Sequence, residues 1–423
     1  MEHECKDIKY QVEHGYQLYT LIHYVNKETL KEEHRKQLSG KASGIDKVTK
    51  EKYEKNLDNN IDDLLVRMKK FSYKPLPVRR TYIPKLNGKM RPLGIPAYED
   101  KLVQGVMANV LSEIYECKFL DCSYGFRPNK NCHQAIREIN QRIMICGVNY
   151  ILDCDIKGFF DNVNHAWLMK FLEHDIHDKK FLRYIKRFLI SGYMEEMKFY
   201  ETDKGTPQGG LISPILANVY LHYVLDLWFE KKIKPMLNGK AYLVRYADDF
   251  IIMFQYEKEA KKVYEMLKER LAKFNLEMEE DKTKIIPFGR YRGTKETFDF
   301  LGFMHYNGTT RTGKYTVGHK MSKKKRKSKQ KLITKWIKDN RHTNLLKLIK
   351  SINRKLIGMY AYYGINGMLK ELYKIYYHTK YMIYSATTRR SQRKMKMRKY
   401  DKVLERIPLV KPKIYKDIWC WST

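Results

Sequence analysis

The spacing of hydrophobic positions changes along the chain and predicts helices near both ends. In residues 57–68 the apolar positions recur at helical spacing, which predicts an N-terminal helix. The same spacing returns in residues 345–359 and 368–376, where it predicts two or three helices in the last quarter of the chain. These C-terminal helices are rich in tyrosine, lysine and arginine, a combination that suits either base stacking or a helix interface.

The middle of the chain shows the short apolar stretches of strands. Residues 81–96 alternate around a Leu-Asn-Gly sequence, which predicts a β-hairpin. Residues 148–155 predict a strand that ends in a turn, and residues 241–254 predict a second hairpin with two adjacent aspartates at its tip. The sequence therefore predicts an α/β body followed by a helical tail.

The charge of the chain restricts its partners. Its 83 lysines and arginines against 48 acidic residues give a formal net charge of +35, which implies a polyanionic partner, with nucleic acid as the first candidate. Between Arg311 and Thr423 there are 32 basic and 5 acidic residues, so this part holds +27 of the total. The basic run 319–331 at its start predicts a linker or a domain edge.

The same composition excludes several classes of protein. A hydrophobic content of 43% with 13% aromatic residues excludes global disorder. No apolar run approaches the length that spans a bilayer, and the charged start of the chain is unlike a signal peptide. Seven cysteines without a CxxC pair fit reduced thiols. We therefore expect a cytoplasmic protein of two or three domains with no membrane partner.

Acidic residues at the ends of the predicted strands indicate a metal site. Asp155 ends one strand, and Asp248 and Asp249 occupy the hairpin tip between apolar residues. Carboxylates in such surroundings are costly unless a cation compensates them, and Mg²⁺ prefers these hard oxygen ligands. Ligands from separate segments suit a two-metal site. A lone Asp-Asp pair is more often a solvated turn, so the pair needs support from other segments.

A glycine-rich segment, residues 204–214, lies between the acidic segments. An apolar-periodic helix is expected after it, from Ile215 to about Phe229, with Ser213 as its N-cap and Pro214 as its first residue. The glycines let the backbone approach a base pair closely, and Gln208 can reach such a pair. A glycine-rich turn before a helix is by itself a weak signal.

Six short segments follow one another in a fixed order: SYGFRPN (123–129), DIKGFFD (155–161), GTPQGG (205–210), YADD (246–249), DKTK (281–284) and FLGF (300–303). In this order they resemble the group II intron-encoded reverse transcriptases, and the resemblance covers roughly residues 40–365. The resemblance implies a right-hand polymerase of the α/β (α+β) class, with fingers, a ferredoxin-like palm that contains an antiparallel sheet, and an α-helical thumb.

The resemblance also implies a division into domains. We expect an N-terminal extension at 1–70, fingers with part of the palm at 71–145, the palm with fingers insertions at 146–318, a helical thumb or maturase-like domain at 319–385, and a basic C-terminal segment at 386–423. Fewer than forty residues follow Tyr384, and Cys420 is the one cysteine among them. We therefore expect no Cys/His-rich endonuclease domain.

Individual residues receive roles from the same resemblance. The main metal ligands are expected to be Asp155 and Asp248, with Asp249 held more loosely and Asp153 in support. Phe160, five positions after Asp155, is expected to place its ring beneath the sugar, where it would collide with a ribose 2′-OH. The full sets are Asp155, Asp248, Asp249 and Lys282 for catalysis; Asp155, Ile156, Asp248 and Asp249 for the metal; Lys85, Arg91, Phe160 and Gln208 for the nucleotide; and Leu301 with Gly302 for the primer grip.

Three of these residues have a second interpretation. Lys282 is a candidate proton donor to the leaving pyrophosphate, or a solvated lysine at a helix end. Phe159 and Phe160 are also candidates for the core, although on an extended segment only one of them can face it. Arg127 either grips a template phosphate or anchors a loop of the fingers.

The implied function is RNA-directed DNA synthesis from a primer by two-metal-ion nucleotidyl transfer. Its cofactor would be two Mg²⁺ ions, with Mn²⁺ as a substitute, and its partners an RNA template, a DNA or RNA primer, dNTPs and a structured, intron-like RNA. The oligomeric state stays open. The alternatives are an RNA-binding maturase that promotes splicing, a free-standing reverse transcriptase of phage defence or CRISPR arrays, and, more weakly, an RNA-dependent RNA polymerase.

Overall fold

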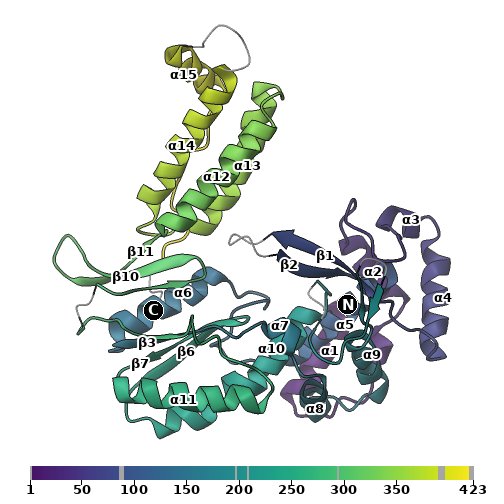
Figure 1. Cartoon of the computed structure of the whole chain (residues 1–423). Helices are drawn as coiled ribbons and strands as arrows, with labels where there is room; N and C mark the ends of the chain where they lie inside the picture. Colours follow the sequence, from purple (N-terminus) through teal and green to yellow (C-terminus); the bar gives the residue numbers. More distant parts are fainter. Residues whose placement is uncertain are drawn as a thin grey trace. The chain divides into compact units, whose positions relative to one another are not determined.

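The structure divides the chain into two compact units. It is a computed structural model, and it describes residues 2–84, 90–195, 198–206, 209–292, 295–388 and 396–418 (Figure 1). Unit 1 comprises Met1–Asn131 and Leu152–Ile285, and unit 2 comprises Cys132–Ile151 and Ile286–Thr423. A short piece of unit 2 is thus inserted into the chain of unit 1. No helix in the described ranges combines the length and the apolarity that a membrane crossing requires.

Helices are the main regular elements of unit 1. The helix predicted at 57–68 is confirmed as α4, but the cap expected at Ser213 is wrong, since Ser213 is the first residue of α10 and Ile212 takes the cap position. Beyond Leu221 this helix continues as π-helical turns, η2 and η3. The helices of unit 1 are α1 (Glu2–Glu13), α2 (Lys27–Lys36), α3 (Lys50–Glu54), α4 (Leu57–Lys69), α5 (Tyr98–Glu116), α7 (Phe159–Asn162), α8 (His165–Asp175), α9 (Lys179–Leu189), α10 (Ser213–Leu221) and α11 (Glu257–Lys273), with the shorter η1 (Ile22–Tyr24), η2 (His222–Asp226), η3 (Phe229–Ile233) and η4 (Lys234–Met236).

Two four-stranded sheets carry the predicted hairpins. In the first, ordered β2-β1-β4-β5, the antiparallel β1 and β2 pair up to Pro84 opposite Met90, and the predicted turn at 86–88 lies outside the described residues. In the second, ordered β6-β7-β3-β8, β6 and β7 are antiparallel as predicted, and β3 lies beside β7. The strands are β1 (Val78–Pro84), β2 (Met90–Ile95), β4 (Tyr193–Glu195) and β5 (Lys198–Tyr200), then β3 (Tyr150–Cys154), β6 (Ala241–Tyr246), β7 (Asp249–Phe254) and β8 (Lys284–Pro287).

The second sheet is buried because its central strand is apolar on both faces. Every residue of β7 after Asp249 is buried, as expected for a continuous apolar run. Helix α11 packs on this strand through apolar residues at helical spacing, which include Ala260, Val263 and Leu267. The rigid core therefore extends to the start of β7, where the acidic residues stand.

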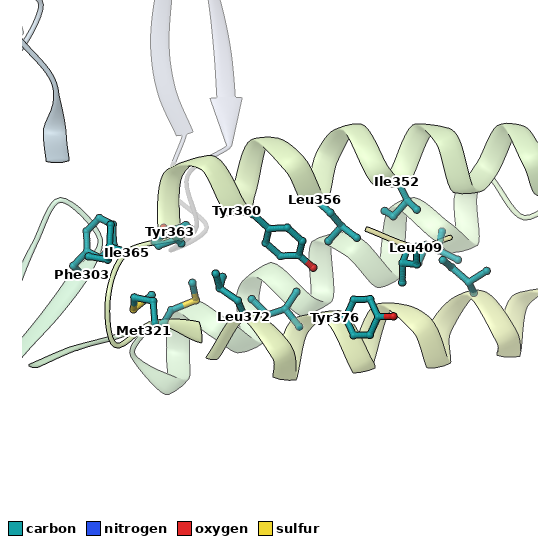
Figure 2. Packing of buried hydrophobic residues seen from close by; sticks show 14 of the residues in the cluster. Phe303, Met321, Ile352, Leu356, Tyr360, Tyr363, Ile365, Leu372, Tyr376 and Leu409 are labelled. Atoms are coloured by element: carbon teal, nitrogen blue, oxygen red, sulfur yellow. The ribbon is translucent and has the colours of Figure 1, made fainter. Parts of the chain in front are cut away.

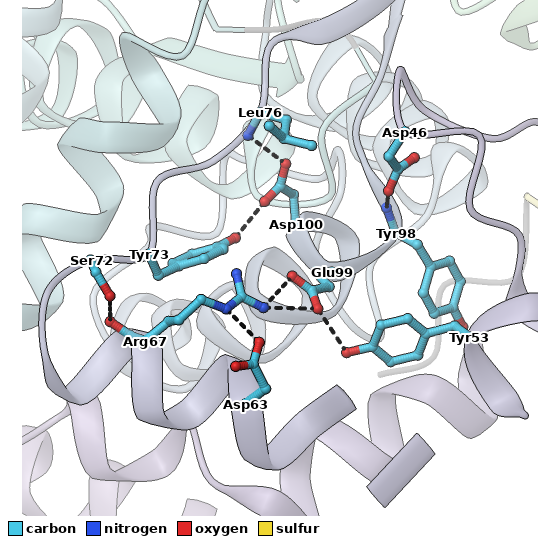
Figure 3. Close-up of polar contacts among 10 residues, drawn as sticks. All are labelled: Asp46, Tyr53, Asp63, Arg67, Ser72, Tyr73, Leu76, Tyr98, Glu99 and Asp100. Carbon is cyan, nitrogen blue, oxygen red and sulfur yellow. Dashed lines mark hydrogen bonds and ion pairs between the residues drawn. The ribbon is translucent and has the colours of Figure 1, made fainter. Parts of the chain in front are cut away.

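A polar network joins the N-terminal helices to the segment that leads into β1 (Figure 3). The Tyr73 hydroxyl donates to Asp100 Oδ1 at 2.5 Å, and the Leu76 N–H donates to Asp100 Oδ2 at 3.0 Å. Beside them, Arg67 donates to both carboxylate oxygens of Glu99 at 2.8 and 3.0 Å. Burial raises the pKa of Asp100 to about 7. The network fixes α4 and α5 against the base of the first sheet.

Unit 2 contains a three-stranded sheet and a group of helices. The sheet is ordered β11-β10-β9, and its strands are antiparallel. We expected the basic run 319–331 to be a linker or a domain edge. It is not a linker, because it forms the end of β11 and then α12, which Ser322 caps by accepting a hydrogen bond from Lys325 N–H. The elements are α6 (Cys132–Ile145), β9 (Thr297–Phe300), β10 (Phe303–Thr309), β11 (Tyr315–Lys320), α12 (Lys323–Asp339), α13 (Leu345–Tyr363), α14 (Leu369–Thr388) and α15 (Met397–Arg406).

The predicted C-terminal helices are confirmed, and their apolar stripes form one core (Figure 2). Ile352, Leu356 and Tyr360 of α13 pack against Leu372 and Tyr376 of α14. The spacing of three and four residues places each set on one side of its helix. Tyrosines of this part therefore divide into two groups, and those on the packed stripes fill the helix interface rather than meeting solvent.

Helix α6 belongs to unit 2 although it lies between two parts of unit 1 in the sequence. Ile136 joins the same apolar core as α13. His133 Nε2 lies 2.7 Å from the Tyr362 carbonyl oxygen, and the buried Asn140 places its Oδ1 3.1 Å from His319 Nε2. The helix is thus tied by buried polar contacts to residues that follow it by about 180 positions and more.

Candidate active site

The acidic hairpin ends in a two-residue turn. Tyr246 pairs with Asp249, so Ala247 and Asp248 form the connection between β6 and β7. Ala247 has a φ of 58°, a left-handed conformation that costs free energy for a residue with a Cβ. Asp248 is half-buried and Asp249 is exposed. A strained turn of this kind persists only where its surroundings hold it.

A buried arginine holds this turn in place. Arg245 is 0% exposed and donates to both carboxylate oxygens of Asp226 at 2.5 and 2.7 Å, to Asn218 Oδ1 at 2.9 Å and to the Ala247 carbonyl oxygen at 3.0 Å. Burial opposes the charge of this guanidinium, but Asp226 outweighs it and raises the pKa of Arg245. Our sequence analysis missed this network. A cation inside the apolar strand 241–246 was the available signal, because such a charge requires a buried partner.

The SYGFRPN segment packs against the same turn. A Cβ on Gly125 would lie 2.3 Å from the Ala247 nitrogen, so the close approach requires glycine. Asn218 Nδ2 donates to the Gly125 carbonyl oxygen at 2.8 Å, and Tyr124 N–H donates to the Arg245 carbonyl oxygen at 2.8 Å. The segment is therefore part of the support of Asp248.

The structure decides between the two interpretations of Arg127. This residue is buried, and its guanidinium donates to both carboxylate oxygens of Glu116 and to the main-chain oxygens of Leu120 and Ser123, at 2.7 to 3.1 Å. All three nitrogens of the guanidinium donate in these contacts. Arg127 is an anchor of the loop, and the hypothesis that it grips a template phosphate is wrong for this arrangement.

Asp155 comes from a different strand and faces the same turn. It follows β3, the neighbour of β7 in the sheet, and its carbonyl oxygen accepts a hydrogen bond from Glu279 N–H at 2.8 Å. Burial raises the pKa of Asp248, and the negative charge of Asp155 raises it further against the lowering effect of Arg91. The charges of Asp155 and Arg91 therefore both act on the carboxyl group of Asp248.

Lys282 pairs with Asp155. Its Nζ lies 2.5 Å from Asp155 Oδ2 and 3.7 Å from Glu279 Oε2, and the hydrogen bond to Asp155 raises the pKa of the ammonium. Lys282 stands in the turn before β8 rather than at the helix end that we considered. The carboxylate of Asp155 thus already carries a cation beside it.

Two carboxylates at this place fit a divalent cation. Within the described ranges no three His, Cys, Asp or Glu side chains gather as a complete metal cage. Asp155 and Asp248 would fill two coordination positions of such a cation, and other oxygens would fill the rest. Mg²⁺ is commonly bound in this way, by one or two carboxylates together with substrate phosphates. Ile156 can add only its main-chain carbonyl oxygen, because its buried side chain is apolar.

The expected nucleotide contacts are described in part. Phe159 and Phe160 are both buried, because residues 159–162 form the short helix α7 rather than an extended segment. Thr206 N–H donates to the Phe160 carbonyl oxygen at 2.8 Å, which brings GTPQGG onto DIKGFFD. Phe160, Thr206 and Arg80 line a cavity of about 270 Å³. Lys85 and Gln208 lie outside the described residues.

The expected primer grip is a tight turn in unit 2. Leu301 and Gly302 connect β9 and β10 with φ values of 47° and 84°. The Tyr362 hydroxyl of α13 donates to the Leu301 carbonyl oxygen at 2.7 Å, and a Cβ on Gly302 would approach the Tyr363 hydroxyl to 3.2 Å. The turn is therefore braced by the helices of its own unit.

A basic groove runs along α12. It has a volume of about 460 Å³, and Asp339 is the one acidic residue in its lining. Across the groove, Thr334 Oγ1 lies 2.9 Å from His378 Nε2 of α14. Tyr377 and Tyr381 of α14, next to His378 in sequence, are 61% and 60% exposed. The lysines of the groove recur at the spacing of one helix face, and they are Lys327, Lys331, Lys335 and Lys338.

Comparisons with known proteins identify similar chains. Residues 83–305 match the family described as reverse transcriptase (RNA-dependent DNA polymerase). The group II intron-encoded protein LtrA of Lactococcus lactis is 42% identical over 178 residues, which cover 42% of this chain and 29% of that protein. Protein YkfC of Escherichia coli is 32% identical over 326 residues, which cover 69% of this chain and 83% of that protein. A putative COX1/OXI3 intron 1 protein of Saccharomyces cerevisiae is 40% identical over 173 residues, which cover 41% of this chain and 20% of that protein. The chain thus spans less than a third of the length of the Lactococcus and Saccharomyces relatives.

Proposed function

The chain belongs to the reverse transcriptase family, and from this premise we propose that it is an RNA-directed DNA polymerase that extends a primer with dNTPs. The expected resemblance to group II intron-encoded proteins and the expected right-hand polymerase fold are confirmed by the family match and the relatives. One observation carries the proposal: Asp155, which follows β3, and Asp248, in the supported turn between β6 and the neighbouring strand β7, come from separate segments, and the charge of Asp155 acts on Asp248.

In this proposal the carboxylates hold the metal and Lys282 supplies a proton. When bound, two divalent cations, Mg²⁺ with Mn²⁺ as a substitute, lower the pKa of the primer hydroxyl and stabilise the leaving oxygen. Asp155 and Asp248 are the main ligands, Ile156 adds its carbonyl oxygen, and Asp249 binds less closely. Lys282 is the proposed proton donor to pyrophosphate, and its position 2.5 Å from Asp155 Oδ2 supports this role, because it places the ammonium beside the metal ligands.

The nucleotide would bind between the first sheet and α7. Its triphosphate needs cationic compensation, which we assign to Lys85 and Arg91. Gln208 contacts the incoming nucleotide, and the ring of Phe160 excludes a ribose 2′-OH. Fixed main-chain contacts of Phe160 with Thr206 support this assignment, because a steric barrier discriminates only when its position is fixed. Leu301 and Gly302 hold the primer end.

Primer extension on an RNA template tests the proposal. We expect Asp155→Asn and Asp248→Asn to reduce incorporation of dNTPs by at least a thousandfold while binding of primer and template persists. Asp121→Asn is the matched control, because that side chain is 97% exposed and its surface ion pair contributes little. Undiminished extension by either active-site variant would refute the assignment. Phe160→Ala should narrow the preference for dNTPs over rNTPs.

A second function, binding of a structured RNA, is favoured by the basic groove. Residues 321–388 contain 17 lysines and arginines and two acidic residues, so this surface attracts phosphates strongly. Tyr377 and Tyr381, exposed on the helix that supplies His378 to the groove, offer faces for unpaired bases. We propose that α12 and α14 bind an intron-like RNA through this combined surface, whether or not the carboxylates are active.

Filter binding separates the two functions. The combined substitution of Lys331 and Lys335 by Gln should weaken RNA binding and flatten its dependence on salt, since each lost phosphate contact reduces the salt slope by about one. Substitution of Lys258 and Lys262, two other lysines four positions apart on a helix, is the control. RNA binding that survives Asp248→Asn but not the groove variant would support two independent functions. Equal loss in the control would remove the groove from the proposal.

A further inference from the structure

The SYGFRPN segment presents one side chain that neither the fold nor the proposed chemistry uses. Gly125 is pressed against Ala247, and Arg127 is clamped by Glu116 and two carbonyl oxygens. Phe126 lies between these two fixed residues and is 56% exposed. Its φ of 57° places a bulky aromatic residue in the left-handed region. The ring is therefore largely exposed, on a loop that is held in place on both sides of it.

The position of Phe126 is unfavourable for folding alone. A ring left half in solvent gains little of the roughly 1.5–3 kcal/mol that full burial of a Phe provides. The left-handed backbone costs about 1–2 kcal/mol more for a residue with a Cβ. A glycine, asparagine or other polar residue would satisfy this position at lower cost. Exposure of the ring together with a left-handed backbone points to a contact outside the fold.

The neighbours of Phe126 indicate what that contact is. Gly125, the residue before Phe126, packs so closely on Ala247 that a Cβ would lie 2.3 Å from the Ala247 nitrogen, and Asp248 follows Ala247, so the backbone at Phe126 lies near the acidic turn. The adjacent guanidinium of Arg127 donates its hydrogen bonds to Glu116 and to the Leu120 carbonyl oxygen, so it is not directed to a phosphate. A ligand that meets Phe126 must therefore do so through a planar, apolar face. At a polymerase turn such faces belong to the bases and sugars of the bound duplex.

From this we propose that Phe126 is a nucleic-acid contact, which packs against a base or sugar of the primer–template duplex near its growing end. The proposal rests on the proposed polymerase function. The SYGFRPN segment then has two tasks, because Gly125 and Arg127 support the acidic turn and Phe126 positions the duplex over it. The ring orders a substrate that the carboxylates act on, and it takes no part in the transfer of protons or phosphoryl groups.

The test compares three variants in primer extension and in a fluorescence scan. Phe126→Ala removes the ring, Phe126→Trp restores an aromatic face, and Tyr256→Ala removes an aromatic side chain of similar exposure, 50%, outside the segment. We expect Phe126→Ala to raise the KM for primer–template about 5- to 100-fold, the range of one stacking contact, with a smaller change in kcat. Phe126→Trp and Tyr256→Ala should keep the wild-type KM.

The fluorescence scan places 2-aminopurine at successive positions of the primer and the template. Stacking on Phe126 should quench one position, and Phe126→Ala should restore its fluorescence while the melting temperature stays within about 2 °C. An unchanged KM and an unchanged scan in Phe126→Ala would overturn the proposal. So would a loss that tryptophan does not rescue. A wild-type protein that neither binds nor extends primer–template would refute the proposed function instead, and the two failures are thus distinguishable.

Discussion

Replacement of Asp226 by Asn removes a charge that supports the acidic turn and leaves the shape of the side chain at position 226 unchanged. Asp226 and Arg245 are both fully buried and are joined by two hydrogen bonds. The amide would keep the volume of the carboxylate but leave the guanidinium as an uncompensated buried charge. Removal of one partner from such a pair costs about 3–5 kcal/mol. At about 2–4 °C per kcal/mol, the melting temperature of unit 1 should fall by roughly 6–20 °C.

A double-mutant cycle measures the pair itself. Arg245→Met alone leaves the Asp226 carboxylate buried without its cation, so it should also destabilise strongly. The combination with Asp226→Leu removes both charges, and an apolar replacement of a buried pair is often nearly neutral. We expect the double variant to lose at least about 2 kcal/mol less than the sum of the single variants. Urea denaturation followed by tryptophan fluorescence gives the three free energies of unfolding.

Measurement of kcat distinguishes two effects of the Asp226–Arg245 pair, its support of the acidic turn and its contribution to the free energy of unfolding. The double variant lacks the donor that Arg245 provides to the Ala247 carbonyl oxygen, so its kcat should fall even where its stability recovers. Asp121→Asn controls for loss of an acid and should change stability by less than about 0.5 kcal/mol. An Asp226→Asn protein that unfolds within 1 kcal/mol of the wild type would refute the reasoning.

Three further predictions concern other parts of the fold. Gly125→Ala should reduce kcat at least tenfold, because its Cβ would lie 2.3 Å from the Ala247 nitrogen, whereas Gly358→Ala, with nothing within 4 Å, should leave kcat unchanged. Burial raises the pKa of Asp100 from 3.8 to about 7, so its contribution to the free energy of unfolding is present below pH 4 and is lost as the pH rises to 7. In chemical denaturation, the free energy of unfolding of Asp100→Asn should lack this pH dependence. Tyr360→Phe should be neutral or stabilising by up to about 1 kcal/mol in thermal unfolding, since the buried hydroxyl has no hydrogen-bond partner within the described structure; a loss above 1 kcal/mol would show that the hydroxyl is satisfied.

Local pattern was sufficient to predict the elements that carry the acidic residues. The apolar run of β7 could only be a buried strand, and the two aspartates before it could only lie at its end. The run 319–331 misled us because lysine favours helices nearly as well as leucine, so charge density alone does not mark a linker. On an extended segment only one of Phe159 and Phe160 could face the core, but Gly158, with a φ of 53°, turns the chain into α7, and both side chains are buried.

Contacts between distant segments could not be predicted from the sequence. The role of Arg127 depends on three acceptors, among them Glu116 eleven positions earlier, that no periodicity reveals. Only the structure identifies Asp226 as the partner of Arg245. The isolated charge in an apolar strand indicated that a buried partner exists, but not which residue it is. Sequence therefore indicated which residues are unusual, and the structure indicated what each of them contacts.

The insertion of Cys132–Ile151 into the chain of unit 1 imposes an order on synthesis. Helix α6 leaves the ribosome long before the residues that it contacts, because Asn140 pairs with His319, which is synthesised much later. At 5–20 residues per second this interval is roughly 10–40 s, during which the apolar face around Ile136 has no core to join. Unit 2 cannot close until most of the chain is made, so α6 remains without its core while the second part of unit 1 is still being synthesised.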